Sequence, residues 1–160
     1  MPVRAAILEQ WLAAAVGVYG DKVAPLVLTE RDPFRNPVGH ALRRHLGLLL
    51  SELLGDMDAA AIDASMEQII AVRAVQELSV EQAVGFVHPL RGILHRELPT
   101  SDAAGLDERI DRLVLAAFAQ FLRCRERLAE LRLNEQLRAL GPMPYRLRAR
   151  PAAAQLPPVG

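Results

Sequence analysis

The chain of 160 residues carries four histidines and one cysteine, the side chains best able to hold a metal or a haem. His40 and His45 lie five positions apart, so on a helix their side chains would point about 140° apart. A two-histidine metal site on one helix needs the spacing i, i+4. His88 and His95 share a helix face but lie about 10 Å apart along its axis. A single ion with bonds of about 2 Å cannot join them. The spacing therefore predicts no metal site.

A haem is the alternative cofactor. A helical chain of this length can be a globin, with His88 or His95 as an axial ligand. However, aromatic residues make up only 4% of the chain, and Pro89 distorts the helix beside His88. We therefore predict no cofactor. The alternative is a haem or a small ligand in a pocket near His40, His88 and Trp11.

Catalytic constellations are absent from the sequence. We find no Ser-His-Asp order, no glycine-rich phosphate loop and no paired acids, so we predict that the protein is not an enzyme. The single cysteine, Cys124, cannot form an intramolecular disulfide, and a reducing cytoplasm is the simplest location. Cys124 is expected to pack in the core, or to meet its mate if two copies pair.

Composition excludes two further classes of protein. The chain has 19 basic and 19 acidic residues and no net charge, whereas a general nucleic-acid binder needs a positive field. No apolar run reaches the roughly 20 residues that cross a bilayer. The apolar content of 51% is mainly aliphatic, which favours packed helices.

The apolar periodicity predicts an all-α fold, a bundle of about five main helices with a long C-terminal helix. A globin-like arrangement is one form that such a bundle can take. The expected helices cover residues 2–18, 36–54, 58–78, 79–98 and 106–140. Asn36 is a good N-cap and Pro37 suits the first helical turn. Gly55 is expected to end that helix.

The fourth expected helix contains its own start and break signals. Ser79 with Gln82 predicts a capping box at its beginning. Pro89 lies inside the segment, where it removes one backbone hydrogen bond and clashes with the preceding turn. We therefore expect a kink near Gly85.

The last helix has a near-heptad apolar seam and a charged second half. The seam consists of Leu106, Ile110, Leu113, Ala117, Gln120 or Phe121, Cys124, Leu128, Leu131 and Glu135. Such a helix is expected to project beyond the core or to pair with a second copy. The candidate interface residues are Phe121, Cys124, Leu128, Leu131 and Leu137. The helical domain is predicted to span 1–140, followed by a disordered or extended proline-rich tail over 141–160.

Three fragments together resemble the N-terminal domain of RsbT co-antagonist proteins of the RsbRD type. They are NPVGHAL (36–42), MEQIIAVRAVQELSVEQAVGFV (66–87) and LDERIDRLVLAAFAQFLRCRERLAELRLNE (106–135). They follow one another in the order and spacing of that family, over about residues 5–138. The chain differs from the longer relatives because its proline-rich end stands where they have a STAS domain.

The resemblance implies a helical input module in a stress-signalling system. A related domain in that system is a globin-like dimer without haem, and some stand-alone members are encoded beside membrane redox complexes. It implies no catalytic residues. We therefore predict a non-catalytic sensory or regulatory module that forms a homodimer and binds neither a metal nor a nucleic acid. Its partner would be a protein of a signalling or redox-associated complex.

Overall fold

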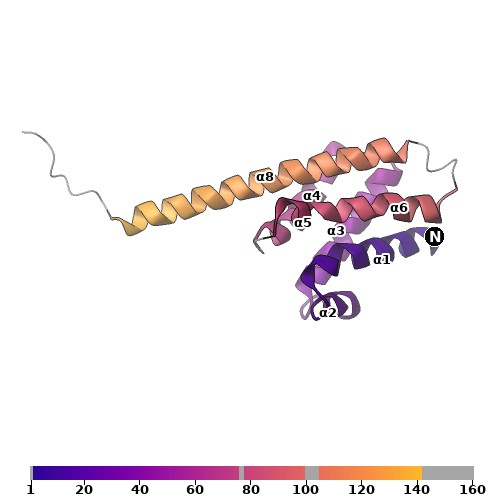
Figure 1. The fold of residues 1–160 in the computed structure, drawn as a ribbon, viewed down its shortest axis with the longest axis horizontal. Helices are drawn as coiled ribbons and strands as arrows, with labels where there is room; N and C mark the ends of the chain where they lie inside the picture. The colour runs from indigo at the N-terminus through magenta and orange to yellow at the C-terminus, as the bar shows by residue number, and fades with distance from the viewer. Residues whose placement is uncertain (1, 76–77, 100–104, 142–160) are drawn as a thin grey trace, which may run out of the picture. The chain divides into compact units, whose positions relative to one another are not determined.

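The computed structural model describes residues 2–75, 78–99 and 105–141. The chain divides into two compact units, residues 1–127 and residues 128–160. The first unit is a bundle of helices, and Figure 1 shows α1 and α6 side by side within it. No strand occurs among the described residues. The predicted all-α class and the long C-terminal helix are therefore confirmed.

The helices follow the predicted segments with two differences. The elements are α1 (Pro2–Val16), a 3-10 turn (Gly17–Tyr19), α2 (Ala24–Thr29), α3 (Pro37–Leu54), α4 (Ala59–Val75), α5 (Val80–Val84), a second 3-10 turn (Gly85–Val87), α6 (His88–Glu97) and α8 (Leu106–Ala139). The short helix α2 lies between the first two predicted segments. The fourth predicted helix is divided into α5 and α6.

The core of the first unit lies where α1, α3, α4 and α6 meet. Helix α3 packs against α4, and α1 packs against both α3 and α6. The fully buried side chains are mainly aliphatic, with one large aromatic anchor, Trp11. The indole N–H of Trp11 donates to the backbone oxygen of Phe86 at 2.7 Å. The two rings stack with centroids 6.3 Å apart, so this contact joins α1 to the turn before α6.

The start of α3 is fixed by Asn36. Its side-chain oxygen accepts from the backbone N–H of Gly39 at 2.8 Å, which confirms the predicted N-cap. Its amide nitrogen donates to the backbone oxygens of Val27 and Glu30, each at 2.8 Å. One side chain thus caps α3 and holds the end of α2 against it. Gly55 ends the helix as predicted.

The fourth predicted helix begins and breaks at the expected places. Ser79 Oγ accepts from the backbone N–H of Gln82, and the Gln82 side chain accepts from the backbone N–H of Ser79, which confirms the capping box. Gly85 begins a 3-10 turn, and α6 starts at His88. Pro89 therefore lies in the first turn of a new helix, where its missing N–H removes no intrahelical hydrogen bond. The expected kink is a full break.

Helix α8 packs on the bundle through the predicted seam as far as Cys124. Its buried residues are Leu106, Ile110, Leu113, Ala117, Gln120, Phe121 and Cys124. Arg109 fastens its first turn, because its guanidinium donates to the backbone oxygens of Leu53 at 2.8 Å and Gly55 at 2.6 Å. Among the described helices, none is long and apolar enough to cross a membrane.

Candidate functional site

Arg73 on α4 is a buried cation with an unusual set of partners. Its side chain is 1% exposed. One terminal nitrogen donates to the backbone oxygen of Gln82 at 3.0 Å, and the other donates to that of Ala15. The guanidinium carbon lies 4.8 Å from the Phe86 ring centroid and 5.7 Å from that of Tyr19. Cation–π attraction of this kind strengthens when the cation is desolvated. Arg73 thus joins α1, α4 and α5.

The electrostatics of this cluster follow from burial. Burial lowers the pKa of Arg73, and the neighbouring Tyr19 opposes that change. Burial raises the pKa of the Tyr19 hydroxyl, which the cation partly offsets. The Arg73 Nε and the Tyr19 hydroxyl are buried without a hydrogen-bond partner among the described residues. The only sequence signal for this cluster was an arginine at a position within the apolar periodicity of α4.

The four histidines do not share one site. His40, His88 and His95 are exposed, and His45 is half-buried. His45 lines a pocket of about 440 Å³ between α3 and α4, together with Arg44, Leu48, Glu52, Ala61, Ala64, Ser65 and Gln68. Its Nδ1 is buried without a partner among the described atoms. Burial, and then the charge of Arg44, lower the pKa of His45.

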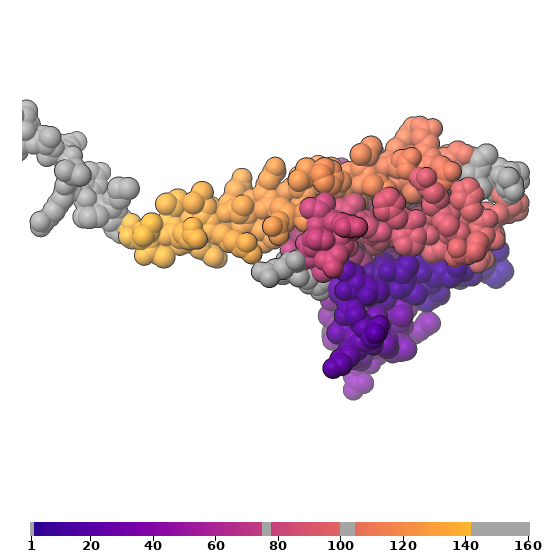
Figure 2. All heavy atoms as spheres, viewed as in Figure 1, coloured from indigo at the N-terminus to yellow at the C-terminus, as the bar shows by residue number. Residues whose placement is uncertain are grey.

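His88 lies in an open groove of about 600 Å³ between α1 and α6. The groove is lined by Gln10, Ala13, Ala14, His88, Pro89, Gly92, Ile93 and Arg96. Figure 2 shows the atoms of α1 and α6 meeting on one face of the first unit. His40 is not among the lining residues, and Trp11 is fully buried. A ligand held by His88 would therefore lie in a surface groove.

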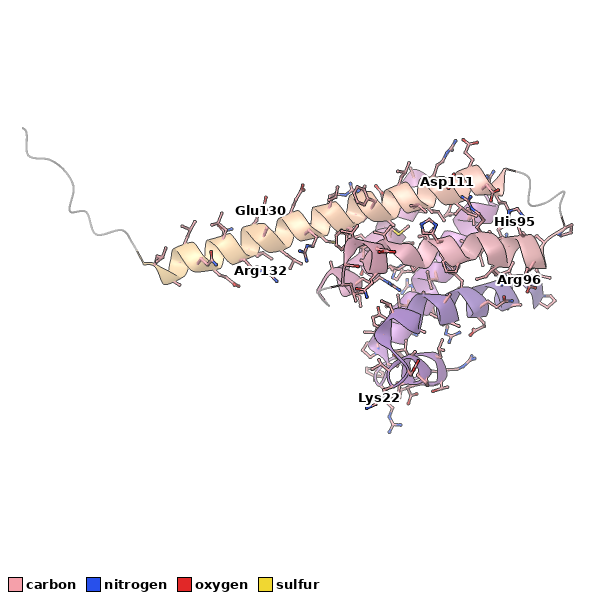
Figure 3. All side chains as sticks on the ribbon, in the orientation of Figure 1. Lys22, His95, Arg96, Asp111, Glu130 and Arg132 are labelled. Carbon is pink, nitrogen blue, oxygen red and sulfur yellow. The ribbon has the colours of Figure 1, made fainter. Side chains whose placement is uncertain are left out.

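A network of exposed charges joins α6 to the first turns of α8. Arg91 reaches Asp111 at 2.5 Å and Asp107 at 3.5 Å, and His95 Nε2 lies 3.1 Å from Asp107. Figure 3 shows His95 on α6 and Asp111 on α8. Exposed ion pairs contribute about 0–1 kcal/mol each. Within the described ranges no group of three or more His, Cys, Asp or Glu residues could hold a metal ion.

The five predicted interface residues fall into three environments. Phe121 and Cys124 are 3% and 8% exposed, so their own chain already covers them. Leu128 is half-buried. Leu131 and Leu137 lie in the second unit and are 58% and 57% exposed. A second copy can contact the two exposed leucines directly, whereas Phe121 and Cys124 contribute to the packing of the first unit.

These features define a helical domain whose polar clusters fasten helices to one another and whose last helix exposes apolar side chains. Comparison with known families is specific. The model for the RsbT co-antagonist protein rsbRD N-terminal domain matches residues 5–136. The chain belongs to this family, a family of regulatory domains in stress signalling, and the resemblance found in the sequence is confirmed. No curated protein and no solved structure matches the chain.

Proposed function

We propose that the protein is a non-catalytic regulatory module that works as a homodimer and passes its signal onward through α8. Family membership supports the regulatory role. The main observation in favour of a dimer comes from the second unit, where four leucines are strongly exposed. Their exposed fractions are 58% for Leu131, 56% for Leu133, 57% for Leu137 and 79% for Leu140. Several exposed leucines on one short helical segment are typical of a contact surface.

The chemistry of this segment supports a helix–helix contact. Charged residues lie before and between the leucines, and Figure 3 labels two of these charged residues, Glu130 and Arg132. Apolar residues flanked by charges of both signs are the pattern by which paired helices select their partner and register. In this proposal the domain acts in the cytoplasm and receives its input in the first unit. It contacts a signalling or redox-associated protein through the dimer.

Sedimentation velocity of the intact chain tests the dimer. Over about a hundred-fold range of concentration, mass action shifts an associating protein between monomer and dimer. We expect twice the chain mass of 17.6 kDa at the upper end. Leu131→Glu and Leu137→Glu are expected to shift the equilibrium to monomer. Gln136→Glu adds the same carboxylate at an exposed polar position of the same segment and is the matched control.

Two results would contradict this proposal. One is a wild-type monomer at every concentration. The other is a leucine variant that dimerises as tightly as the control.

The proposal needs no cofactor, and haem binding is tested separately. Hemin is titrated into the purified protein and the visible spectrum is recorded. We expect no Soret band of a ligated haem. A stoichiometric Soret band that His88→Ala or His40→Ala abolishes would replace the proposal with a haem sensor, because an axial histidine determines that spectrum.

A further inference from the structure

A groove between α3 and α4 has a polar end and an apolar middle. The two helices pack against each other and are joined by residues 55–58, and helices with so short a connection run antiparallel. Arg44 on α3 therefore lies level with Gln68 on α4, and Leu48 lies level with Ala64. All four side chains line the groove, whose volume is about 440 Å³. This volume is within the range of small-molecule sites.

The polar end of the groove carries hydrogen-bond donors that the described part of the protein does not use. Arg43 pairs with Glu9, whereas the exposed Arg44 pairs with no carboxylate among the described residues. Gln68 is also exposed and adds an amide N–H. A guanidinium has five N–H donors and no acceptor. This end of the groove is therefore complementary to a group that accepts hydrogen bonds.

His45 adds no charge to this end of the groove at neutral pH. Its Nδ1 is buried without a partner among the described atoms, and an imidazolium would place an unpaired N–H there. Burial, and then the charge of Arg44, lower the pKa of His45 accordingly. The guanidinium of Arg44 is therefore the charge that a ligand meets at this end.

Glu52, the carboxylate among the lining residues, does not oppose an anion beside Arg44. Its Oε2 accepts from the backbone N–H of Asp58 at 3.0 Å. It follows Arg44 by eight residues, which is about 12 Å along the helix axis. That distance exceeds the Debye length of about 8 Å at physiological ionic strength. The end of the groove at Arg44 and Gln68 is therefore positive.

The middle of the groove is apolar and begins one helical turn away from Arg44. Leu48 is 46% exposed although it is a large aliphatic side chain. Ala64, opposite it, is small and leaves room above the helix surface. A ligand that uses both parts of the groove therefore carries its charge within one helical turn, about 6 Å, of its apolar body.

We propose that this groove binds a small organic anion, with its carboxylate beside Arg44 and Gln68 and a short aliphatic body on Leu48 and Ala64. A guanidinium donates to both oxygens of a carboxylate in one plane, which gives orientation as well as affinity. A ligand cation would instead meet the charge of Arg44. The site goes beyond the proposed function and does not depend on it, because every lining residue belongs to one copy of the chain.

The test titrates sodium hexanoate into the full chain and follows the backbone amides by ¹H–¹⁵N NMR. Hexanoate has the carboxylate and the short aliphatic body that the groove requires. We expect the amide shifts of Arg44, Leu48, Ala64 and Gln68 to change and to saturate. Hexylamine has a similar body and a positive charge at neutral pH, and it should produce no saturating shift at these amides.

Two arginine variants test the charge of the site. Arg44→Gln removes the charge and keeps an amide, and we expect it to raise the hexanoate dissociation constant at least about ten-fold, because it removes a charge-assisted contact. Arg31→Gln is the matched control, since Arg31 is an exposed arginine outside the groove. It should bind hexanoate like the wild type.

Two alanine positions on α4 test the apolar part of the site. Ala64→Leu places a larger side chain in the groove opposite Leu48 and should abolish saturation. Ala60→Leu makes the same change at an exposed position of α4 that does not line the groove. Leucine is a strong helix former, so both variants should fold, as circular dichroism will show.

Three results would overturn this inference. They are hexanoate shifts that do not saturate at the groove, equal binding of hexylamine, and an Arg44→Gln variant that binds as tightly as Arg31→Gln. Sedimentation of the wild type measures the homodimer independently. A groove that fails to bind hexanoate in a protein that dimerises therefore removes this site and leaves the proposed function in place.

Discussion

At the scale of single residues, Arg73 shows how a buried cation can be held without a carboxylate among the described residues. Its two hydrogen bonds end on backbone oxygens in the last turns of α1 and α5. Oxygens in the last turn of a helix lack intrahelical donors and carry the negative end of the helix dipole. The guanidinium supplies both the missing donors and the matching charge. Arg73 therefore stabilises the junction of three helices.

Removing Arg73 is expected to destabilise the protein strongly. Hydrogen bonds to a charged group contribute about 1.5–3 kcal/mol each, and truncation leaves a cavity. We expect Arg73→Ala to lower the free energy of unfolding by about 2–4 kcal/mol. Arg73→Met should lower it less, because methionine fills most of the volume without a buried charge.

Urea unfolding followed by circular dichroism measures both Arg73 variants. The exposed Arg125, whose guanidinium lies over Phe121, gives a control in Arg125→Ala. A surface change of this kind stays within about 0.5 kcal/mol. An Arg73→Ala midpoint equal to that of the control would show that the buried contacts of Arg73 contribute nothing to stability.

His45 gives a prediction on pH. Burial and then Arg44 lower its pKa in the folded state below the ordinary value of 6.5. In the window between these two values the unfolded chain binds more protons, so stability falls as pH falls through it. Above pH 6.5 the imidazole is neutral in both the folded and the unfolded chain, so His45 no longer makes stability depend on pH. We expect His45→Gln to flatten this part of the stability profile.

Thermal unfolding of wild type and His45→Gln at a series of pH values measures the effect. His40→Gln, at an exposed histidine of the same helix, controls for loss of an imidazole. Parallel profiles for wild type and His45→Gln would refute the role of His45.

At the scale of elements, two glycines of α3 make a matched pair. Alanine favours a helix over glycine by about 1 kcal/mol. At Gly47 an added Cβ would meet only Leu8 Cδ2 at 3.5 Å, an ordinary contact. At Gly39 it would lie 2.6 Å from the Val27 backbone oxygen and even closer to the Asn36 amide. The contact that ties α2 to α3 leaves no room there.

We therefore expect the two alanine variants to move stability in opposite directions. Gly47→Ala should raise the free energy of unfolding by about 0.5–1 kcal/mol. Gly39→Ala should lower it by about 1–3 kcal/mol, because the backbone must shift to relieve the overlap. Thermal melts of both variants beside the wild type measure the difference. If Gly39→Ala is as stable as Gly47→Ala, α2 is not held against α3 in the way that Asn36 indicates.

Local signals in the sequence determined the helix ends well. Asn36, Gly55 and Ser79 act within three or four residues, so their effect can be seen without knowledge of the fold. The effect of Pro89 was harder to predict, because a proline can kink a helix or begin a new one. The choice depends on whether the preceding turn can leave the helical path, which packing decides.

At the scale of the whole molecule, the sequence predicted the seam of α8 that faces the bundle as far as Cys124, but not the exposed apolar residues on the other side of the helix. The seam through Cys124 has the expected heptad spacing, and the structure shows it to be core. Leu115, Phe118 and Leu122 lie on the other side of the same apolar stretch. Likewise, the role of Arg73 depends on backbone oxygens of α1 and α5, which only the folded chain brings within hydrogen-bonding distance of its guanidinium. Such contacts join distant parts of the chain and leave no local signal.

The proposed dimer also predicts how stability depends on concentration. A partner that binds only the folded chain stabilises it by mass action, and the melting temperature then rises with protein concentration. We expect such a rise for the wild type and a flat dependence for Leu137→Glu in the second unit. Leu26→Glu should rise like the wild type, because its leucine lies on α2. Differential scanning calorimetry at a series of concentrations measures this. A wild-type melting temperature that does not change with concentration would mean that folding and association are not linked, and that the exposed apolar side of α8 is stable in water alone.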